Sequence, residues 1–136
     1  MSKDKAGSEG CWVSLILRLA VASLFAATAI DKFSGNLDSI VTNFQEMFKS
    51  TWLPMPLVVL HARLVPYLEA LIPIWLLSGF RLKLGWVVTA LFMVTLAFGM
   101  MVAKQYAVAT NNYLYVMICC AGLYFSQFDT VRFVGK

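Results

Sequence analysis

The stretch Arg63-Leu-Val-Pro-Tyr-Leu-Glu-Ala-Leu-Ile-Pro-Ile-Trp-Leu-Leu-Ser-Gly79 decides the fold of this chain. It is mostly apolar and, with the residues before it, reaches the length of about 20 residues that a membrane-spanning helix needs. Its centre nevertheless carries an acid, Glu69. A charged side chain at that depth is costly and marks either a functional site or a buried partner. The sequence therefore predicts a spanning helix whose one acid requires an explanation.

Three further apolar stretches accompany this one. The predicted spans cover residues 12–30, 57–79, 84–103 and 110–128. Only 13% of the 136 residues are charged, whereas a soluble domain has about 25%. The predicted fold class is all-α, a bundle of four transmembrane helices. It forms one membrane domain over residues 12–128, between tails at 1–11 and 129–136.

The connection over residues 31–56 is the only long one between predicted spans. Apolar residues recur in it at helical spacing: Leu37, Ile40, Val41, Phe44, Met47 and Phe48. This pattern predicts a short amphipathic helix between the first two spans. The helix either lies on the outer membrane surface or caps the outer mouth of the bundle. The prolines in Trp52-Leu-Pro-Met-Pro56 end it.

The basic residues predict the orientation. Six fall on one side of the predicted membrane: Lys3, Lys5, Arg81, Lys83, Arg132 and Lys136. Three fall on the other side: Lys32, Lys49 and Lys104. Because Lys and Arg accumulate on the cytoplasmic side, both termini are expected in the cytoplasm. The net charge of +4 is scattered rather than clustered, so nucleic acid is not an expected partner.

Arg18 interrupts the first span and is the best partner for Glu69 that the sequence offers. At about 1.5 Å per residue, the two lie roughly 9 Å and roughly 15 Å from the cytoplasmic ends of their spans. Arg18 shares a helix face with Ala22, Ala26 and Ala29, so it is expected to point into the bundle. The pair either fixes helix register as a buried ion pair or forms a site for a proton, a quinone headgroup or a small anion. Contact with a partner subunit is a third alternative.

A second polar pair is predicted near the outer side. Asp31 ends the first span, and Arg63 lies about 9 Å inside the second. The two side chains either meet, or Arg63 extends alone toward the headgroups.

No metal site and no catalytic residue are predicted. The three cysteines, Cys11, Cys119 and Cys120, form no C-x-x-C pair, and His61 is the single histidine. A metal site needs several converging ligands, which this set does not supply. His61 is expected to be a solvated residue at the outer interface.

Several short motifs of the chain resemble the DoxX/DoxD-like family of small four-helix membrane proteins. They are Leu17-Arg-Leu-Ala-Val-Ala-Ser-Leu-Phe25, Asp31-Lys-Phe33, Leu53-Pro-Met-Pro56, Val65-Pro-Tyr-Leu-Glu69 and Leu77-Ser-Gly-Phe-Arg81. The resemblance spans about residues 14–105 and makes Arg18, Lys32 and Glu69 the family-like polar residues. It implies a location in the bacterial inner membrane. Within the family, DoxD resembles the membrane subunit of a thiosulfate:quinone oxidoreductase, and other relatives resemble accessory proteins of redox systems.

The expected function is that of a non-catalytic accessory subunit of a larger membrane redox or energy-converting complex. Its partners would be the lipid bilayer and other membrane subunits. One alternative is a quinone-reducing subunit in which Arg18 and Glu69 flank the quinone. Another is a small transporter or lipid-binding module. No intrinsic cofactor is expected, and quinone and bound lipid are the two ligand alternatives.

Overall fold

The computed structural model describes residues 2–131, with side chains from residue 5 onward except that of residue 6. Its helices are α1 (Ser2–Ser34), α2 (Leu37–Phe48), α3 (Met55–Ser78), α4 (Leu82–Val102), α5 (Tyr106–Phe125) and a 3-10 helix (Ser126–Phe128). Four of them, α1, α3, α4 and α5, are long and apolar enough to cross a membrane. The predicted all-α bundle of four spanning helices is therefore confirmed.

The first helix is longer than the sequence predicts. It begins at Ser2 rather than near residue 12, so the predicted N-terminal tail largely continues the helix. At the other end of the chain, Asp129 of the predicted C-terminal tail is buried against the bundle. Residues 132–136 of that tail lie outside the described part of the chain.

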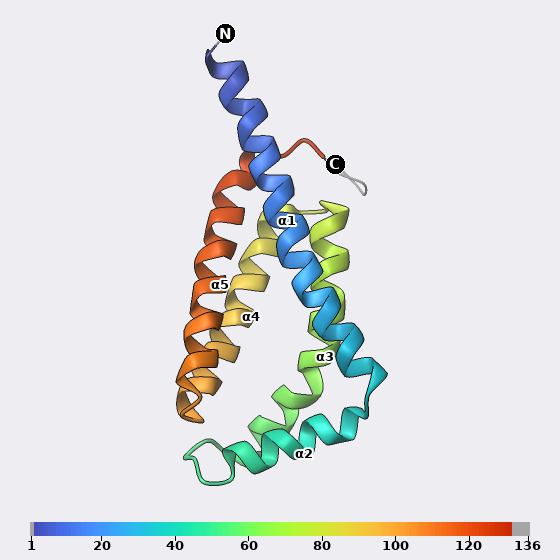
Figure 1. The fold of residues 1–136 in the computed structure, drawn as a ribbon, viewed down its shortest axis with the longest axis vertical. Helices are drawn as coiled ribbons and strands as arrows, with labels where there is room; N and C mark the ends of the chain where they lie inside the picture. Colours follow the sequence, from blue (N-terminus) through green and yellow to red (C-terminus); the bar gives the residue numbers. More distant parts are fainter. Residues whose placement is uncertain (1, 132–136) are drawn as a thin grey trace.

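The predicted amphipathic segment forms α2. Asn36 begins this helix, because its side-chain oxygen accepts a hydrogen bond from the Asp38 N–H at 2.9 Å. The helix packs against α3 and crosses the end of the bundle opposite the termini (Figure 1). This is the geometry of the capping alternative.

Two proline residues, Pro66 and Pro73, lie inside α3 without ending it. Each removes a backbone donor, which permits a bend in the helix. Figure 1 shows that α3 changes direction along its length. The helix ends at Gly79, whose φ of 73° is a left-handed conformation that glycine adopts without strain.

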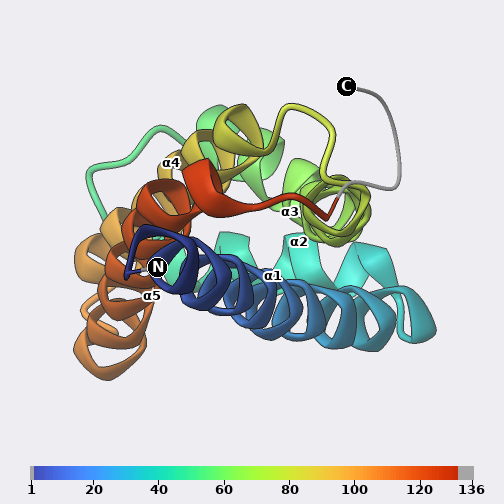
Figure 2. The same ribbon diagram turned by 90° about the horizontal axis from the view of Figure 1, so that it is seen from above.

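The spanning helices form two pairs, with α1 packed along α3 and α4 packed along α5. Figure 2 shows α1 running obliquely across the bundle. The buried core includes Trp86, Leu76, Ile72 and Phe25. Gly122 allows α5 to approach the Trp86 indole closely, since a Cβ there would lie 2.5 Å from the ring.

Candidate functional site

Arg18 is fully buried and lies beside the C-terminal turn of α3. Its Nε donates to the Leu76 carbonyl at 2.7 Å, and its Nη2 donates to the Leu77 carbonyl at 2.8 Å. Both carbonyls belong to the last turn of α3, where a helix leaves carbonyls without partners of its own. The guanidinium therefore caps the C-terminus of α3.

The third nitrogen of Arg18 holds the segment that follows α5. Its Nη1 lies 3.1 Å and 3.2 Å from the two carboxylate oxygens of Asp129 and donates to the Val131 carbonyl at 2.7 Å. The Ser14 hydroxyl donates to the same carboxylate at 2.7 Å. The Arg18 and Asp129 side chains are 1% and 0% exposed. We call this set, Ser14, Arg18 and Asp129, the Arg18 clasp.

The Arg18 clasp joins three parts of the chain that are distant in sequence: α1, the end of α3 and the segment after the 3-10 helix. Every nitrogen of the guanidinium has an acceptor within the protein. A buried ion pair is tolerated in an apolar environment when its remaining donors and lone pairs are also satisfied. The geometry is therefore that of a structural tie between helices.

Glu69 takes its partner from the opposite end of α1. The Lys32 Nζ lies 2.5 Å from its Oε2, and the side chains are 26% and 6% exposed. The pair joins α1 to the middle of α3, next to an edge-on contact between the rings of Phe33 and Tyr67. Lys32, predicted only as a family-like position, is thus the cation that accompanies the acid of the second span.

The predicted ion pair between Arg18 and Glu69 is wrong. Arg18 meets α3 at Leu76, seven residues beyond Glu69, which corresponds to about 10 Å of helix rise. Glu69 instead forms an ion pair with Lys32, and Arg18 forms one with Asp129. The predicted depth of Arg18 was wrong because it was counted from the start of the first helix. That helix begins ten residues earlier than the sequence predicts.

Asp129 is a site residue that the sequence does not predict, because it falls in the predicted C-terminal tail. A usable signal was present, since Asp129 is the only acid after Glu69 and directly follows an apolar span. A buried arginine such as Arg18 needs an anionic partner, and Asp129 lies at the same end of the bundle.

The predicted contact between Asp31 and Arg63 is not formed. Both side chains are exposed on the outward faces of their helices, and no ion pair joins them within residues 2–131. The inward positions next to Arg63 belong to Ala62 and Val65, which are 1% exposed each. Arg63 is therefore left to extend along the outer surface of the bundle.

The Lys32–Glu69 pair provides a first prediction. We expect Lys32→Met and Glu69→Gln each to lower the free energy of unfolding. Interaction energies between contacting residues are about 0.5–3 kcal/mol, and the value for this pair is expected in the lower half of that range. The lower half is expected because Lys32 is still 26% exposed. The measurement is a double-mutant cycle of chemical unfolding in detergent micelles. Additive effects of the two substitutions would show that the pair does not link α1 and α3.

The three cysteines lie on α1 and α5. All three cysteines are free; Cys119 is buried, Cys11 half-buried and Cys120 exposed. Within residues 2–131, no group of three or more His, Cys, Asp or Glu side chains is placed to hold a metal ion.

Comparison with known proteins gave one match. The family model described as DoxX matches residues 13–102, which include Arg18, Lys32 and Glu69. No curated protein and no solved structure matches the chain. Asp129 lies beyond the matched segment, so the Arg18 clasp joins a residue inside that segment to one outside it.

Proposed function

The chain belongs to the DoxX family and is a multi-pass integral membrane protein, and from that premise we propose that it is a non-catalytic accessory subunit of a larger membrane complex. The complex would be of the redox or energy-converting type that the family resemblance implies. The partner subunit would contact α5. The observation that carries this proposal is the outward face of that helix.

One face of α5 presents a continuous row of exposed side chains. The row consists of Tyr106, Thr110, Tyr113, Met117, Cys120 and Tyr124. Successive members are alternately four and three residues apart, an average of 3.6. Because 3.6 residues make one turn of an α-helix, the row stays on one face of α5 over several turns. We call this row the α5 stripe.

The helix that carries the α5 stripe is the least buried of the four spanning helices. Only 17% of the apolar stretch of α5 is buried, compared with 33% to 39% in the other three spanning helices. Tyr106 and Tyr124 lie at the ends of α5, where water is available, whereas Tyr113 lies inside the span. A tyrosine hydroxyl taken out of water needs a hydrogen-bond partner. A second membrane helix packed along the stripe would supply a partner for Tyr113 and would bury the flexible Met117 side chain.

Site-specific photo-crosslinking in native membranes tests this proposal. A photoreactive amino acid at Met117, which is 69% exposed, is expected to give a discrete crosslinked protein. The matched control is Ile74, which is 68% exposed on the outward face of α3 and should give lipid adducts only. Crosslinks to a second copy of this chain, or equal crosslinking from both positions, would contradict the accessory role.

A further inference from the structure

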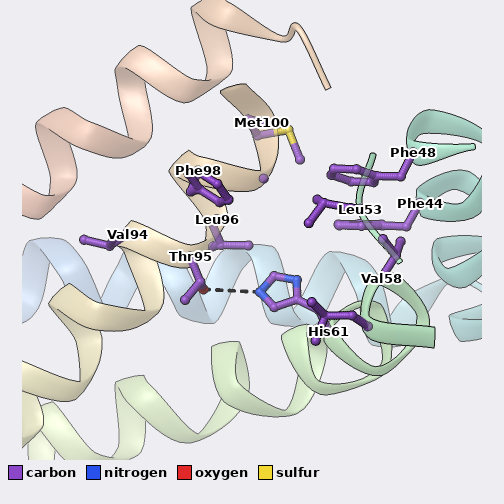
Figure 3. A pocket seen from close by; sticks show the side chains of 12 residues that line it. Phe44, Phe48, Leu53, Val58, His61, Val94, Thr95, Leu96, Phe98 and Met100 are labelled. Carbon is purple, nitrogen blue, oxygen red and sulfur yellow. Dashed lines mark hydrogen bonds between the residues drawn. The ribbon is translucent and has the colours of Figure 1, made fainter. Parts of the chain in front are cut away.

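A cavity of about 360 Å³ lies between α2, α3 and α4, at the end of the bundle that α2 covers (Figure 3). Its volume is within the range of about 300–1,000 Å³ that small-molecule sites occupy. Two aromatic rings of α2, Phe44 and Phe48, stack with their centroids 6.1 Å apart and form one wall. The lining is apolar apart from His61 of α3 and Thr95 of α4.

The hydrogen bonds around Thr95 favour a proton on His61 Nε2. The Thr95 hydroxyl donates to the Phe92 carbonyl at 2.7 Å, so its oxygen acts as the acceptor for His61 Nε2 at 3.2 Å. A neutral imidazole has one N–H and one acceptor nitrogen. With the proton on Nε2, the Nδ1 atom is the acceptor. Figure 3 shows this second ring nitrogen on the side of the imidazole toward Leu53 and Phe44.

We propose that this cavity binds a membrane-soluble amphiphile that carries a hydroxyl group on an apolar body. The hydroxyl donates to Nδ1 of His61, and the apolar body packs against Phe44, Phe48 and Phe98. A ligand with carbonyl oxygens alone, such as a quinone, lacks the donor that Nδ1 requires. The site is separate from the Arg18 clasp and from the α5 stripe and does not depend on the proposed function.

The space available to the apolar body can be altered at Gly99 of α4. A Cβ at this position would lie 3.5 Å from Phe48 Cζ, which is an ordinary van der Waals contact. Gly99→Ala is therefore accommodated, whereas the longer side chain of Gly99→Leu extends into the cavity. Gly99→Leu tests the effect of filling the cavity, and Gly99→Ala controls for the loss of the glycine.

Photoaffinity labelling of the full chain in lipid nanodiscs tests the proposal. The probes are a diazirine-bearing dodecanol and a diazirine-bearing alkylphenol, each paired with its methyl ether, which lacks the donor. Each hydroxyl probe is expected to label the cavity peptides about 2- to 10-fold more than its ether, the effect of one hydrogen bond. The stronger of the two hydroxyl probes identifies the apolar body as a flexible chain or a planar ring.

The variants give the decisive comparison. His61→Leu should abolish the difference between hydroxyl and ether probes, whereas His61→Asn, whose amide oxygen replaces Nδ1 as acceptor, should retain it. Gly99→Leu should abolish cavity labelling, and Gly99→Ala should leave it unchanged. Equal labelling by hydroxyl and ether probes in the unsubstituted protein would overturn the proposal, and this comparison holds even if Gly99→Leu does not fold.

Discussion

Replacement of Arg18 by methionine is expected to lower the free energy of unfolding by about 3–5 kcal/mol, the cost of removing one partner of a buried ion pair. The substitution leaves the Asp129 carboxylate without its cation and the Leu76 and Leu77 carbonyls without their donor. Methionine fills a similar volume, so the loss reflects charge and hydrogen bonding rather than a cavity. Circular dichroism during chemical unfolding in detergent micelles provides the measurement.

The matched control for this prediction is Arg63→Met. Arg63 is also an arginine of a spanning helix, but it is exposed and makes no ion pair within the described residues. Its effect should remain within about 0.5 kcal/mol. Adding Asp129→Leu to Arg18→Met should recover part of the lost stability, because the orphaned charge is then removed. If Arg18→Met and Arg63→Met behave alike, the Arg18 clasp does not hold the bundle together.

Substitution of Gly122 by leucine is the second change with a large expected effect. Even a Cβ at this position would lie 2.5 Å from the ring of Trp86, a fully buried core residue. The side chain must therefore push α5 away from α4. Inserting atoms into a packed core typically costs about 1–3 kcal/mol, and a contact this close to a buried indole ring places the variant at or above the upper value.

Thermal unfolding of detergent-solubilised protein measures this effect as a fall in Tm. Gly7→Leu is the matched control, because a Cβ at Gly7 has no neighbour within 4 Å, and its Tm should remain unchanged or rise slightly. Trp86→Ala should partly rescue Gly122→Leu by vacating the space that the new side chain needs. A Gly122→Leu variant as stable as the Gly7→Leu variant would show that α5 can shift away from Trp86 without cost.

The spans of the bundle were predictable from sequence because length and apolarity are local properties. The stretch around Glu69 identified a spanning helix without any knowledge of its neighbours, and the spacing of apolar residues over 31–56 predicted the short helix that became α2. The alanine face of the first span also indicated correctly that Arg18 points inward, since Ala22 and Ala29 on that face are buried, as Arg18 is.

The partners of the buried charges were not predictable in the same way. Two antiparallel helices meet at a register that depends on their tilt and on where each one begins, and the oblique α1 begins earlier than its apolar run. A difference of seven residues along α3 separates the position that Arg18 reaches from the position of Glu69. A side chain cannot span about 10 Å of additional helix rise, so the predicted pair could not form.

The sequence by itself determined that this is a four-helix membrane protein with buried charges that need partners, because the cost of a charge in lipid follows from composition and depth alone. Only the tertiary structure decided which partners they take. Lys32 reaches Glu69, and the chain turns back after α5 to bring Asp129 to Arg18. Those pairings depend on helix tilt, helix register and the path of the chain, which no single segment of sequence contains.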